Sequence, residues 1–175
     1  MKKIMFSDAF CLTQAVLDGS KTMTRRLLKD NVPLGNWEET KKHLPYKVGE
    51  VVAIAQRYKE VYPNADFEMI GDGFMTESAG WANKMFVKAE LMPHHIRITD
   101  VKIERLRDIS EEDALREGVW QMGELFYVSK AVGEAPEVAF PTAREAFWYL
   151  IDKISGKGTW ESNPLMAAYS FELVD

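Results

Sequence analysis

The sequence predicts an α+β fold, in which short helices surround a small, mostly antiparallel sheet or barrel. Three observations lead to this class. At least four short segments have the apolar runs or the alternation typical of strands. The helical patterns between them are short, and long loop-like stretches separate them. The chain has 175 residues, of which 46% are hydrophobic, so we expect residues 1–175 to form a single domain with a sizeable core.

The first third of the chain predicts two strands and one helix. Residues 4–6 are a short apolar run and form the first strand or its approach. Apolar residues recur at helical spacing over residues 12–16, and Gly19 is well placed as the residue just past the helix end. Residues 27–46 mix charges with prolines and read as a long surface excursion. The apolar run at 51–55 then predicts a buried strand.

The middle of the chain predicts one long insertion and two further strands. Residues 58–83 are rich in glycine, asparagine and proline and read as a loop-like insertion. The run at 85–89 predicts a strand. Residues 96–106 alternate over a longer stretch, and the phase slips between Ile98 and Val101, which indicates a β-bulge.

The last third predicts two helices and a closing strand. Ser110 caps a helix whose first turn holds the acidic residues 111–113, where a helix N-terminus favours negative charge, and Gly118 ends it. Residues 119–140 read as a third irregular excursion. A Thr-x-x-Glu capping box at 142–145 opens the next helix. Its apolar residues fall on one face: Phe147, Leu150, Ile151 and Ile154. Alternation over 168–173 predicts the closing strand.

Composition narrows the functional classes. The net charge of −5 makes non-specific attraction to nucleic acid unlikely for the chain as a whole, so any polyanion must meet a local patch. The lone Cys11 excludes an internal disulfide and suits a reducing compartment. No apolar run is long enough for a membrane span, and the N-terminal residues do not resemble a signal peptide, so we expect a cytoplasmic protein without membrane contact. The oligomeric state stays open.

The sequence predicts neither a metal nor a cofactor. His94 and His95 are adjacent, so on an extended segment they point to opposite faces and cannot easily share one ion. His43 is distant along the chain and Cys11 has no partner. The glycine-rich phosphate and dinucleotide motifs are absent, as is the Gly-x-Ser-x-Gly motif of serine hydrolases.

The segment from Gly19 to Arg26 concentrates charged and hydroxyl side chains that could bind or react with a ligand. Its sequence is Gly-Ser-Lys-Thr-Met-Thr-Arg-Arg, which places an amine, two hydroxyls and two guanidinium groups on one loop after a helix. If burial lowers the pKa of Lys21, its amine can deprotonate the Thr24 hydroxyl three residues on. Arg26 can then hold a carbonyl oxygen or a phosphate. The alternative is a solvated basic turn without a ligand.

Glu117 is the second candidate site residue. It lies in the last turn of its helix, directly before Gly118, where the helix dipole disfavours a carboxylate. A residue held against a local preference can mark a functional site. The alternative is that Glu117 simply pairs with a nearby lysine or arginine.

The pattern Gly19-x-Lys21-Thr22-x-Thr24-x-Arg26 resembles the Gly-x-Lys-x-x-(Glu/Thr)-x-Arg signature of ASCH domains, small β-barrel domains related to the PUA fold. Further similar segments lie at 48–52, 98–106, 108–118 and 158–172, so the resemblance spans about residues 5 to 174. They are similar to a group of ASCH proteins found largely in bacterial genomes and prophages. The resemblance implies a PUA-like barrel, with the excursions at 27–46, 58–83 and 119–140 as insertions.

The resemblance also implies a function. The superfamily is associated with RNA, nucleotides and modified bases, and one branch hydrolyses the amide of N4-acetylcytidine. Its catalytic set corresponds here to Lys21 as general base, Thr24 as nucleophile or water positioner, and Glu117 as proton shuttle to the leaving amine. Other residues of the signature are then expected to bind the ligand: Gly19, Thr22, Arg25 and Arg26. That branch is much shorter than this chain, so the excursions can reshape or cover the cleft.

Two other functions remain open. Many ASCH proteins share the signature without known catalysis, so the same residues can form a non-catalytic RNA-binding module. In that case a set of cations would hold the phosphate backbone while an aromatic ring stacks on a base; these are Lys21, Arg25, Arg26, Lys29 and Arg97. The third possibility is a phage or host accessory protein that uses the fold only as an interaction scaffold.

Overall fold

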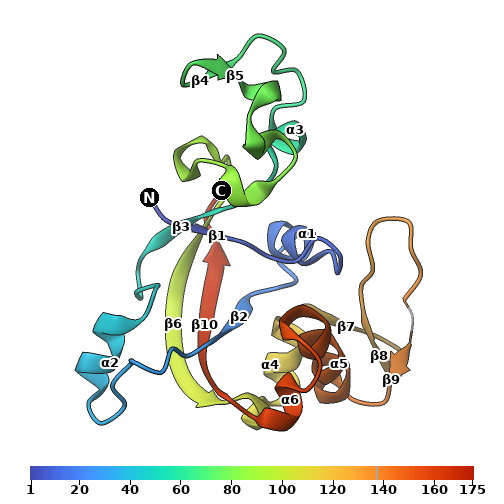
Figure 1. The fold of residues 1–175 in the computed structure, drawn as a ribbon. Helices are drawn as coiled ribbons and strands as arrows, with labels where there is room; N and C mark the ends of the chain where they lie inside the picture. The colour runs from blue at the N-terminus through green and yellow to red at the C-terminus, as the bar shows by residue number, and fades with distance from the viewer. Residues whose placement is uncertain (137) are drawn as a thin grey trace.

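The computed structural model describes residues 1–136 and 138–175. Five strands form the main sheet in the order β1-β3-β6-β10-β2 (Figure 1). Their bounds are β1 Lys3–Ile4, β2 Met23–Leu27, β3 Val51–Ile54, β6 His95–Arg105 and β10 Leu165–Leu173. Only β1 and β3 pair in parallel, and every other pair is antiparallel. The predicted α+β class with a mostly antiparallel sheet is therefore confirmed. In the described residues no ladder joins β1 to β2, so both are edge strands of a curved but open sheet.

Four helices lie along one side of this sheet, with α1 near β1 and with α4, α5 and α6 near the start of β10 (Figure 1). They are α1 Leu12–Leu17, α4 Glu111–Arg116, α5 Ala143–Ser155 and α6 Thr159–Ser162; a 3-10 turn at Leu106–Asp108 leads into α4. The predicted caps are present: the Ser110 hydroxyl accepts from the Asp113 N–H at 3.1 Å, and the Thr142 hydroxyl accepts from the Glu145 N–H at 3.1 Å.

The predicted bulge and the long strand containing it are also present. The register between β6 and β10 shifts between Ser170 and Phe171, which pair with Asp100 and Ile98, so Thr99 is the extra residue. This is the place where the hydrophobic alternation slips in the sequence. The shift keeps apolar side chains on the core side of the sheet beyond the bulge.

The excursion that the sequence predicts at 119–140 contains a further three-stranded sheet. Its strands are β7 Val119–Met122, β8 Leu125–Val128 and β9 Ala139–Phe140. Gly123, with a φ of +63°, is the first residue of the two-residue turn between β7 and β8, a position that favours glycine. Trp120 and Tyr127 stack across this hairpin with their rings 4.6 Å apart. The short Gly-Glu turn is the signal that sequence reasoning missed.

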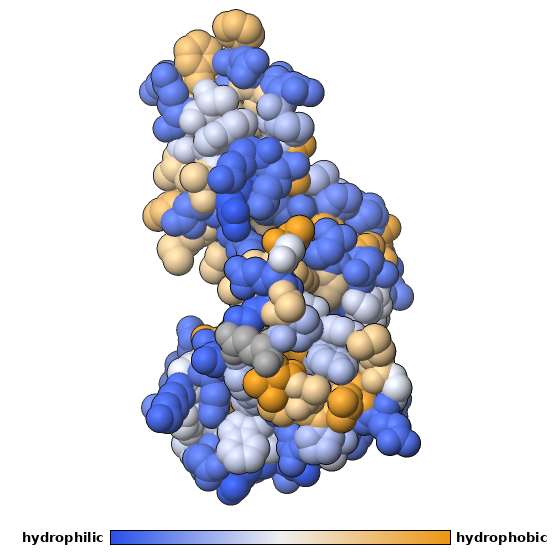
Figure 2. All heavy atoms as spheres, turned by 90° about the vertical axis from the view of Figure 1, so that its right-hand side faces the viewer, coloured by the Kyte–Doolittle hydropathy of each residue, from blue (hydrophilic) through white to orange (hydrophobic). Residues whose placement is uncertain are grey.

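The segment from 58 to 92 is a lobe with its own small core. It contains α3 Tyr58–Val61, the hairpin β4 Met69–Ile70 and β5 Gly73–Phe74, and four 3-10 turns. Those turns are Met75–Glu77, Ala79–Trp81, Lys84–Phe86 and Ala89–Leu91. Tyr58, Met75 and Met92 are buried together in this small core. Figure 2 shows this lobe projecting from the body, with apolar atoms at its outer tip.

The predicted strand at 85–89 is wrong, because this stretch lies in two of those 3-10 turns. The Asn83 side chain caps the first turn by accepting from the Met85 N–H at 3.0 Å. The carbonyls of Met85 and Val87 both accept from Lys3 Nζ at 2.6 Å. A lysine side chain thus satisfies backbone groups that a neighbouring strand would otherwise have to satisfy.

The excursion at 27–46 also has regular structure, the helix α2 Trp37–His43. Asn36 caps it, accepting from the Glu38 N–H at 2.9 Å, which is a local signal that the mixed composition concealed. None of the helices in the described residues is long and apolar enough to cross a bilayer. The main core lies between the sheet and α5, where Ile98, Leu150 and Met166 are buried in one cluster.

Candidate functional site

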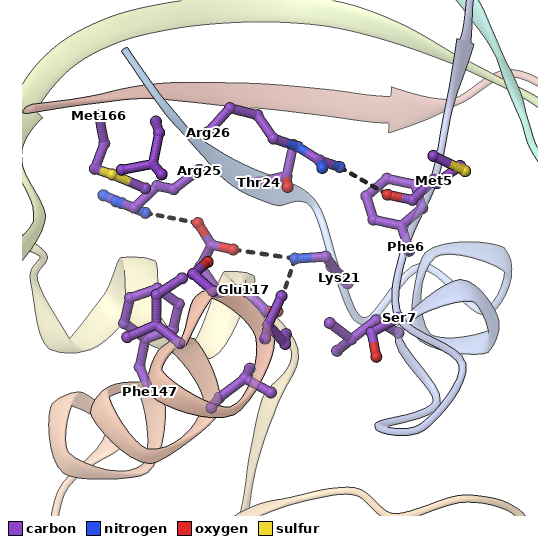
Figure 3. Close-up of a pocket in the computed structure, with 16 residues that line it drawn as sticks. Met5, Phe6, Ser7, Lys21, Thr24, Arg25, Arg26, Glu117, Phe147 and Met166 are labelled. Carbon is purple, nitrogen blue, oxygen red and sulfur yellow. Dashed lines mark hydrogen bonds and ion pairs between the residues drawn. The ribbon is translucent and has the colours of Figure 1, made fainter. Parts of the chain in front are cut away.

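A cavity of about 330 Å³ lies at the free edge of β2. Three parts of the chain enclose it: residues 21–27, the segment Met5–Ser7 that follows β1, and the face of α5 around Phe147 (Figure 3). Lys21, Thr24 and Glu117 all line it. The fold therefore brings the three predicted catalytic residues to one cavity, although Glu117 is 96 positions from Lys21.

The local structure explains how Lys21 enters the core. Helix α1 ends at Leu17, and Gly19 takes a left-handed φ of +83°, which turns the chain sharply. The Lys21 N–H then donates to the Ala15 carbonyl at 2.9 Å. This turn directs the next residues into β2 and points the lysine inward, so the solvated basic turn is excluded for Lys21, whose exposed fraction is 2%.

Three oxygen atoms surround the Lys21 amine. Lys21 Nζ donates to the Met23 carbonyl at 2.7 Å, the Glu117 carbonyl at 2.8 Å and Glu117 Oε2 at 3.1 Å. Burial lowers the pKa of Lys21, the neighbouring Arg25 and Arg26 cations lower it further, and the Glu117 carboxylate only partly offsets them. A buried lysine with a lowered pKa can lose its proton more readily than a surface lysine and so can act as a base.

Glu117 lies between two cations. It is the C-cap residue of α4 and is buried, with an exposed fraction of 4%. Oε2 faces Lys21, and Oε1 accepts from Arg25 at 2.9 Å. These contacts outweigh the unfavourable helix dipole at this position. The next residue, Gly118, has a φ of +109°, and an added Cβ would lie 2.7 Å from Leu12, so glycine permits the close approach of α1 to Glu117.

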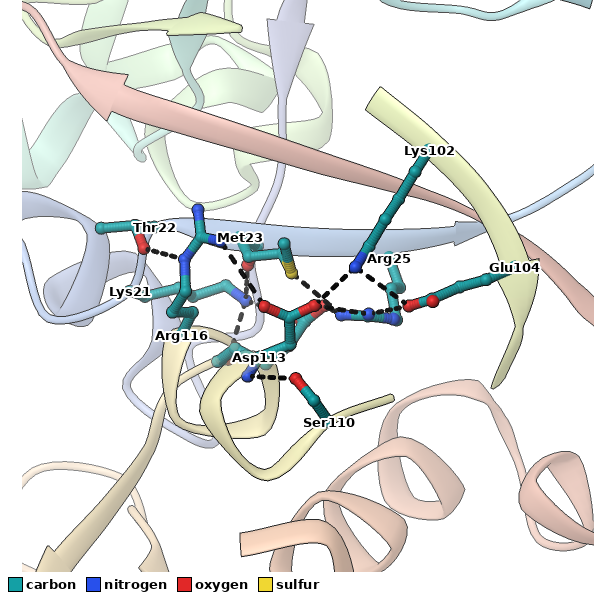
Figure 4. Close-up of polar contacts among 10 residues, drawn as sticks. Lys21, Thr22, Met23, Arg25, Lys102, Glu104, Ser110, Asp113 and Arg116 are labelled. Carbon is teal, nitrogen blue, oxygen red and sulfur yellow. Dashed lines mark hydrogen bonds and ion pairs between the residues drawn. The ribbon is translucent and has the colours of Figure 1, made fainter. Parts of the chain in front are cut away.

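Arg25 joins Glu117 to a larger ionic network (Figure 4). Its guanidinium, fully buried, also contacts Glu104 and lies 3.5 Å from Asp113. Burial disfavours the cation, but the Glu117 and Glu104 carboxylates outweigh this effect and raise the pKa of Arg25. Lys102 contacts Asp113 at 2.8 Å. Arg25 is thus held by carboxylates, and its side chain supports Glu117 at the wall of the cavity.

Thr24 and Arg26 lie on the face of β2 opposite to Arg25. The Thr24 hydroxyl has no hydrogen-bond partner in the described residues, and its oxygen points toward the space between Lys21 and Arg26 (Figure 3). Arg26 donates to the Met5 carbonyl at 2.8 Å and so bridges β2 and the segment after β1. Lys21 and Arg26 both lie within 6 Å of the Phe6 ring, at 5.7 and 5.9 Å, which favours cations there.

The remaining wall is apolar. The face of α5 predicted from the sequence lines it, together with Met166 of β10. Pockets for small organic ligands typically combine such a wall with a few convergent polar groups. One side of this cavity therefore suits a flat apolar ring, and the other side supplies charged and hydroxyl groups.

Two predicted binding residues lie outside the cavity wall. Gly19 forms the turn before Lys21, and the Thr22 hydroxyl accepts from Arg116 Nε at 3.0 Å. We therefore assign both to positioning the loop. Sequence reasoning missed Glu104 and assigned Asp113 only to helix capping, because their partner Arg25 is far away in the sequence. No cluster of three or more His, Cys, Asp or Glu side chains within 1–136 and 138–175 is placed to hold a metal ion.

Comparison with known proteins gives little further guidance. No protein-family model matches the chain, and no curated protein matches it. Among solved structures, the chain is similar to protein EF3133 from Enterococcus faecalis V583, described as a member of family DUF984. The match has a TM-score of 0.49 and 16% identity, and it covers 100% of this chain and 77% of the other. A likeness at this level carries no argument about chemistry, so the function must be argued from the cavity.

Proposed function

We propose that this protein is an ASCH-type amidohydrolase that binds a modified nucleoside beside Lys21 and hydrolyses an amide on its base. The observation that carries the proposal is the buried Lys21 amine, with a lowered pKa, in contact with Glu117 and facing the same cavity as the unpartnered Thr24 hydroxyl. These are a base, an acid partner and a nucleophile at one place, the combination that covalent acyl transfer requires. An N4-acylcytidine is the substrate that the sequence resemblance favours.

The proposed chemistry has two steps. Neutral Lys21 takes the proton of the Thr24 hydroxyl as its oxygen bonds to the acyl carbon, and the carbonyl electrons move onto the oxygen. The carbonyl re-forms as the C–N bond breaks, and the leaving amine receives the proton from Lys21 by way of Glu117. Water then attacks the threonine ester as it gives a proton to the same Lys21 amine, and the ester bond breaks as that proton passes to the Thr24 oxygen, which releases the acid and restores Thr24. If Thr24 instead positions a water, that water attacks directly and the proton transfers are unchanged.

The size and lining of the cavity support a single nucleoside as ligand. A volume of about 330 Å³ lies at the lower end of the range for small-molecule sites. The apolar face of α5 suits a base, and the polar side meets the group that reacts. The net charge of −5 also makes a long polyanion a poor partner for the molecule as a whole.

The test is hydrolysis of N4-acetylcytidine by purified protein, followed by chromatography. We expect turnover in the natural sequence and in the control Lys59→Ala, which removes an exposed lysine of α3. Lys21→Ala and Glu117→Gln should each lower kcat by at least about a hundredfold, the usual contribution of a general acid or base. Unchanged kcat in Lys21→Ala, or no turnover at high enzyme concentration, would refute the proposal.

A non-catalytic RNA-binding module, with Lys21 in a structural role and not on the phosphate backbone, is the second candidate, because one observation favours a structural Lys21. An ammonium has three N–H donors, and Lys21 uses all three on oxygen atoms of its own chain, as a purely structural lysine would. Measured binding separates the two functions. An RNA-binding module should bind a single-stranded RNA with an affinity that falls steeply with salt and that weakens in Lys29→Ala, whereas Lys29→Ala should leave nucleoside hydrolysis unchanged.

A further inference from the structure

The hydrogen-bonding direction of each β2 residue can be read from its register with β10. β2 is an edge strand, and in the part of the chain that the structure describes its one partner strand is β10. At its two ends, the Phe171 N–H donates to the Thr22 carbonyl at 2.9 Å, and the Leu28 N–H donates to the Leu165 carbonyl at 3.1 Å. Backbone groups alternate between the two sides of a strand. The even-numbered residues of β2 therefore bond to β10, and the odd-numbered residues direct their N–H and C=O groups to the free edge.

The free edge presents an acceptor and a donor to the cavity. The Met23 carbonyl is already occupied by Lys21 Nζ. The Arg25 carbonyl and the Leu27 N–H come next, and no hydrogen bond to either is made by the residues that the structure describes. In an extended strand, the C=O of one residue and the N–H of the residue two positions on point to the same side. Both residues line the cavity.

We infer that this backbone pair recognises the base. The Arg25 carbonyl accepts an N–H of a planar nucleobase, and the Leu27 N–H donates to the acceptor beside it on the same base edge. The pairing edge of cytidine offers this pattern, with an amino N–H next to ring N3. The inference rests on the proposed function for the class of ligand, and it adds the atoms that read the base.

A nucleobase fits this edge better than a peptide does. An unpaired strand edge can also accept a peptide as an additional strand, but an added strand needs a continuous open edge. Here the Arg26 guanidinium crosses from β2 to the Met5 carbonyl at 2.8 Å. The apolar residues of α5 and the segment Met5–Ser7 enclose a cavity of about 330 Å³ beside the edge. Such an enclosed site admits one flat ring.

Leu27→Pro tests the inference because it deletes one donor selectively. Proline has no N–H, and the Leu27 N–H does not bond to β10, so the sheet ladder is retained at an edge position where proline is tolerated. The matched control is Leu27→Ala, which shortens the same half-exposed side chain and keeps the N–H. We expect Leu27→Pro to bind cytidine about tenfold more weakly than Leu27→Ala, as measured by titration calorimetry, the loss of roughly one hydrogen bond.

A second ligand makes the test specific. 3-Deazacytidine replaces ring N3 by a C–H and so cannot accept from Leu27. The protein should bind it about tenfold more weakly than cytidine, and this difference should disappear in Leu27→Pro. Equal binding of cytidine by Leu27→Pro and Leu27→Ala overturns the inference. If Leu27→Pro does not fold, equal affinity of the natural sequence for cytidine and 3-deazacytidine overturns it instead.

The outcome also separates this inference from the proposed function. If nucleosides bind tightly and neither Leu27→Pro nor the change to 3-deazacytidine weakens binding, only the role of the backbone pair is refuted. Absence of binding to cytidine, 3-deazacytidine and N4-acetylcytidine in the natural sequence refutes the proposed function and the inference together. Binding of an extended peptide that Leu27→Pro abolishes, without any nucleoside binding, would assign the edge to a different class of partner and would also overturn the inference.

Discussion

Replacing Glu117 by glutamine should show how much of the stability depends on the buried ion pair. The carboxylate has an exposed fraction of 4% and faces Lys21 at 3.1 Å and Arg25 at 2.9 Å. Arg25 keeps Glu104 when Glu117 is neutral, but Lys21 loses the one carboxylate that contacts it among the described residues. Removing one partner of a buried pair typically costs about 3–5 kcal/mol. We expect Glu117→Gln to lose about 3 kcal/mol at neutral pH, near the lower limit, because Lys21 can release its proton.

The pH dependence of this loss provides an independent check. Burial lowers the pKa of Lys21 in the folded protein, and removing the carboxylate lowers it further. Between that pKa and the ordinary value near 10.4, the unfolded chain binds more protons than the folded one, so stability rises with pH. The deficit of Glu117→Gln should therefore shrink toward about pH 10. Urea unfolding at neutral pH and at about pH 10 measures both quantities.

Three variants complete this experiment. Lys21→Met removes the buried amine while Glu117 keeps Arg25, so it should be at least as stable as the natural sequence. The double variant should lose less than the sum of the single variants, with a coupling of at least about 1 kcal/mol. Glu38→Gln is the control, because Glu38 pairs with Lys41 on the exposed face of α2 at 2.9 Å and should cost no more than about 0.5 kcal/mol. Additive losses, or a loss below about 1 kcal/mol in Glu117→Gln, would refute the reasoning.

Three further predictions concern the surroundings of the site. Gly118→Ala should cost about 1–3 kcal/mol in thermal unfolding, because its φ is +109° and a Cβ would meet Leu12 at 2.7 Å; Gly35→Ala, where a Cβ meets nothing, should change little, and equal effects would contradict this. Tyr169 is buried, and desolvation of its hydroxyl raises its pKa to about 12. The unfolded chain therefore loses this proton first, and stability falls from about pH 10 to 12; Tyr169→Phe should flatten that fall, and an unchanged slope would refute the assignment. Asp113→Asn should lose about 2 kcal/mol at neutral pH. Burial tends to raise the pKa of Asp113, but the Lys102 hydrogen bond and nearby cations outweigh it, so this difference should vanish as acid protonates the carboxyl, and a constant difference would contradict it.

The elements that could be predicted from the sequence are those with local signals. Alternation over 96–106, the N-cap at Ser110 and the capping box at Thr142 specify β6, α4 and α5, because their causes lie within a few residues. The sheet at 119–140 was missed because its hairpin has a two-residue turn amid mixed composition. The stretch 85–89 has the pattern of a strand, but Lys3 satisfies its carbonyls, and that contact spans more than 80 positions.

In the candidate site, too, some features have a local signal in the sequence and others do not. The amine, hydroxyl and carboxylate of Lys21, Thr24 and Glu117 were identified by type and by a resemblance, and the unfavourable helix position of Glu117 was a local signal. The burial of Lys21 has no local signal in the sequence, because it depends on the close approach of α1 that Gly118 permits. The ion pair between Arg25 and Glu117 also has no local signal, because the two residues lie far apart in the sequence.

The cost of burying Lys21 bears directly on its role. A lysine at this position is desolvated, and its pKa is lowered despite the Glu117 carboxylate, so the folded state is less stable than with a neutral apolar residue there. Glu117 does not need Lys21 as a partner, because Arg25 bonds to its other oxygen at 2.9 Å. Folding alone therefore does not explain this lysine. Its amine faces a cavity that also holds a hydroxyl and two backbone groups to which the described residues make no hydrogen bond, and the proton transfer that we propose is a use of a buried amine that would justify the lost stability.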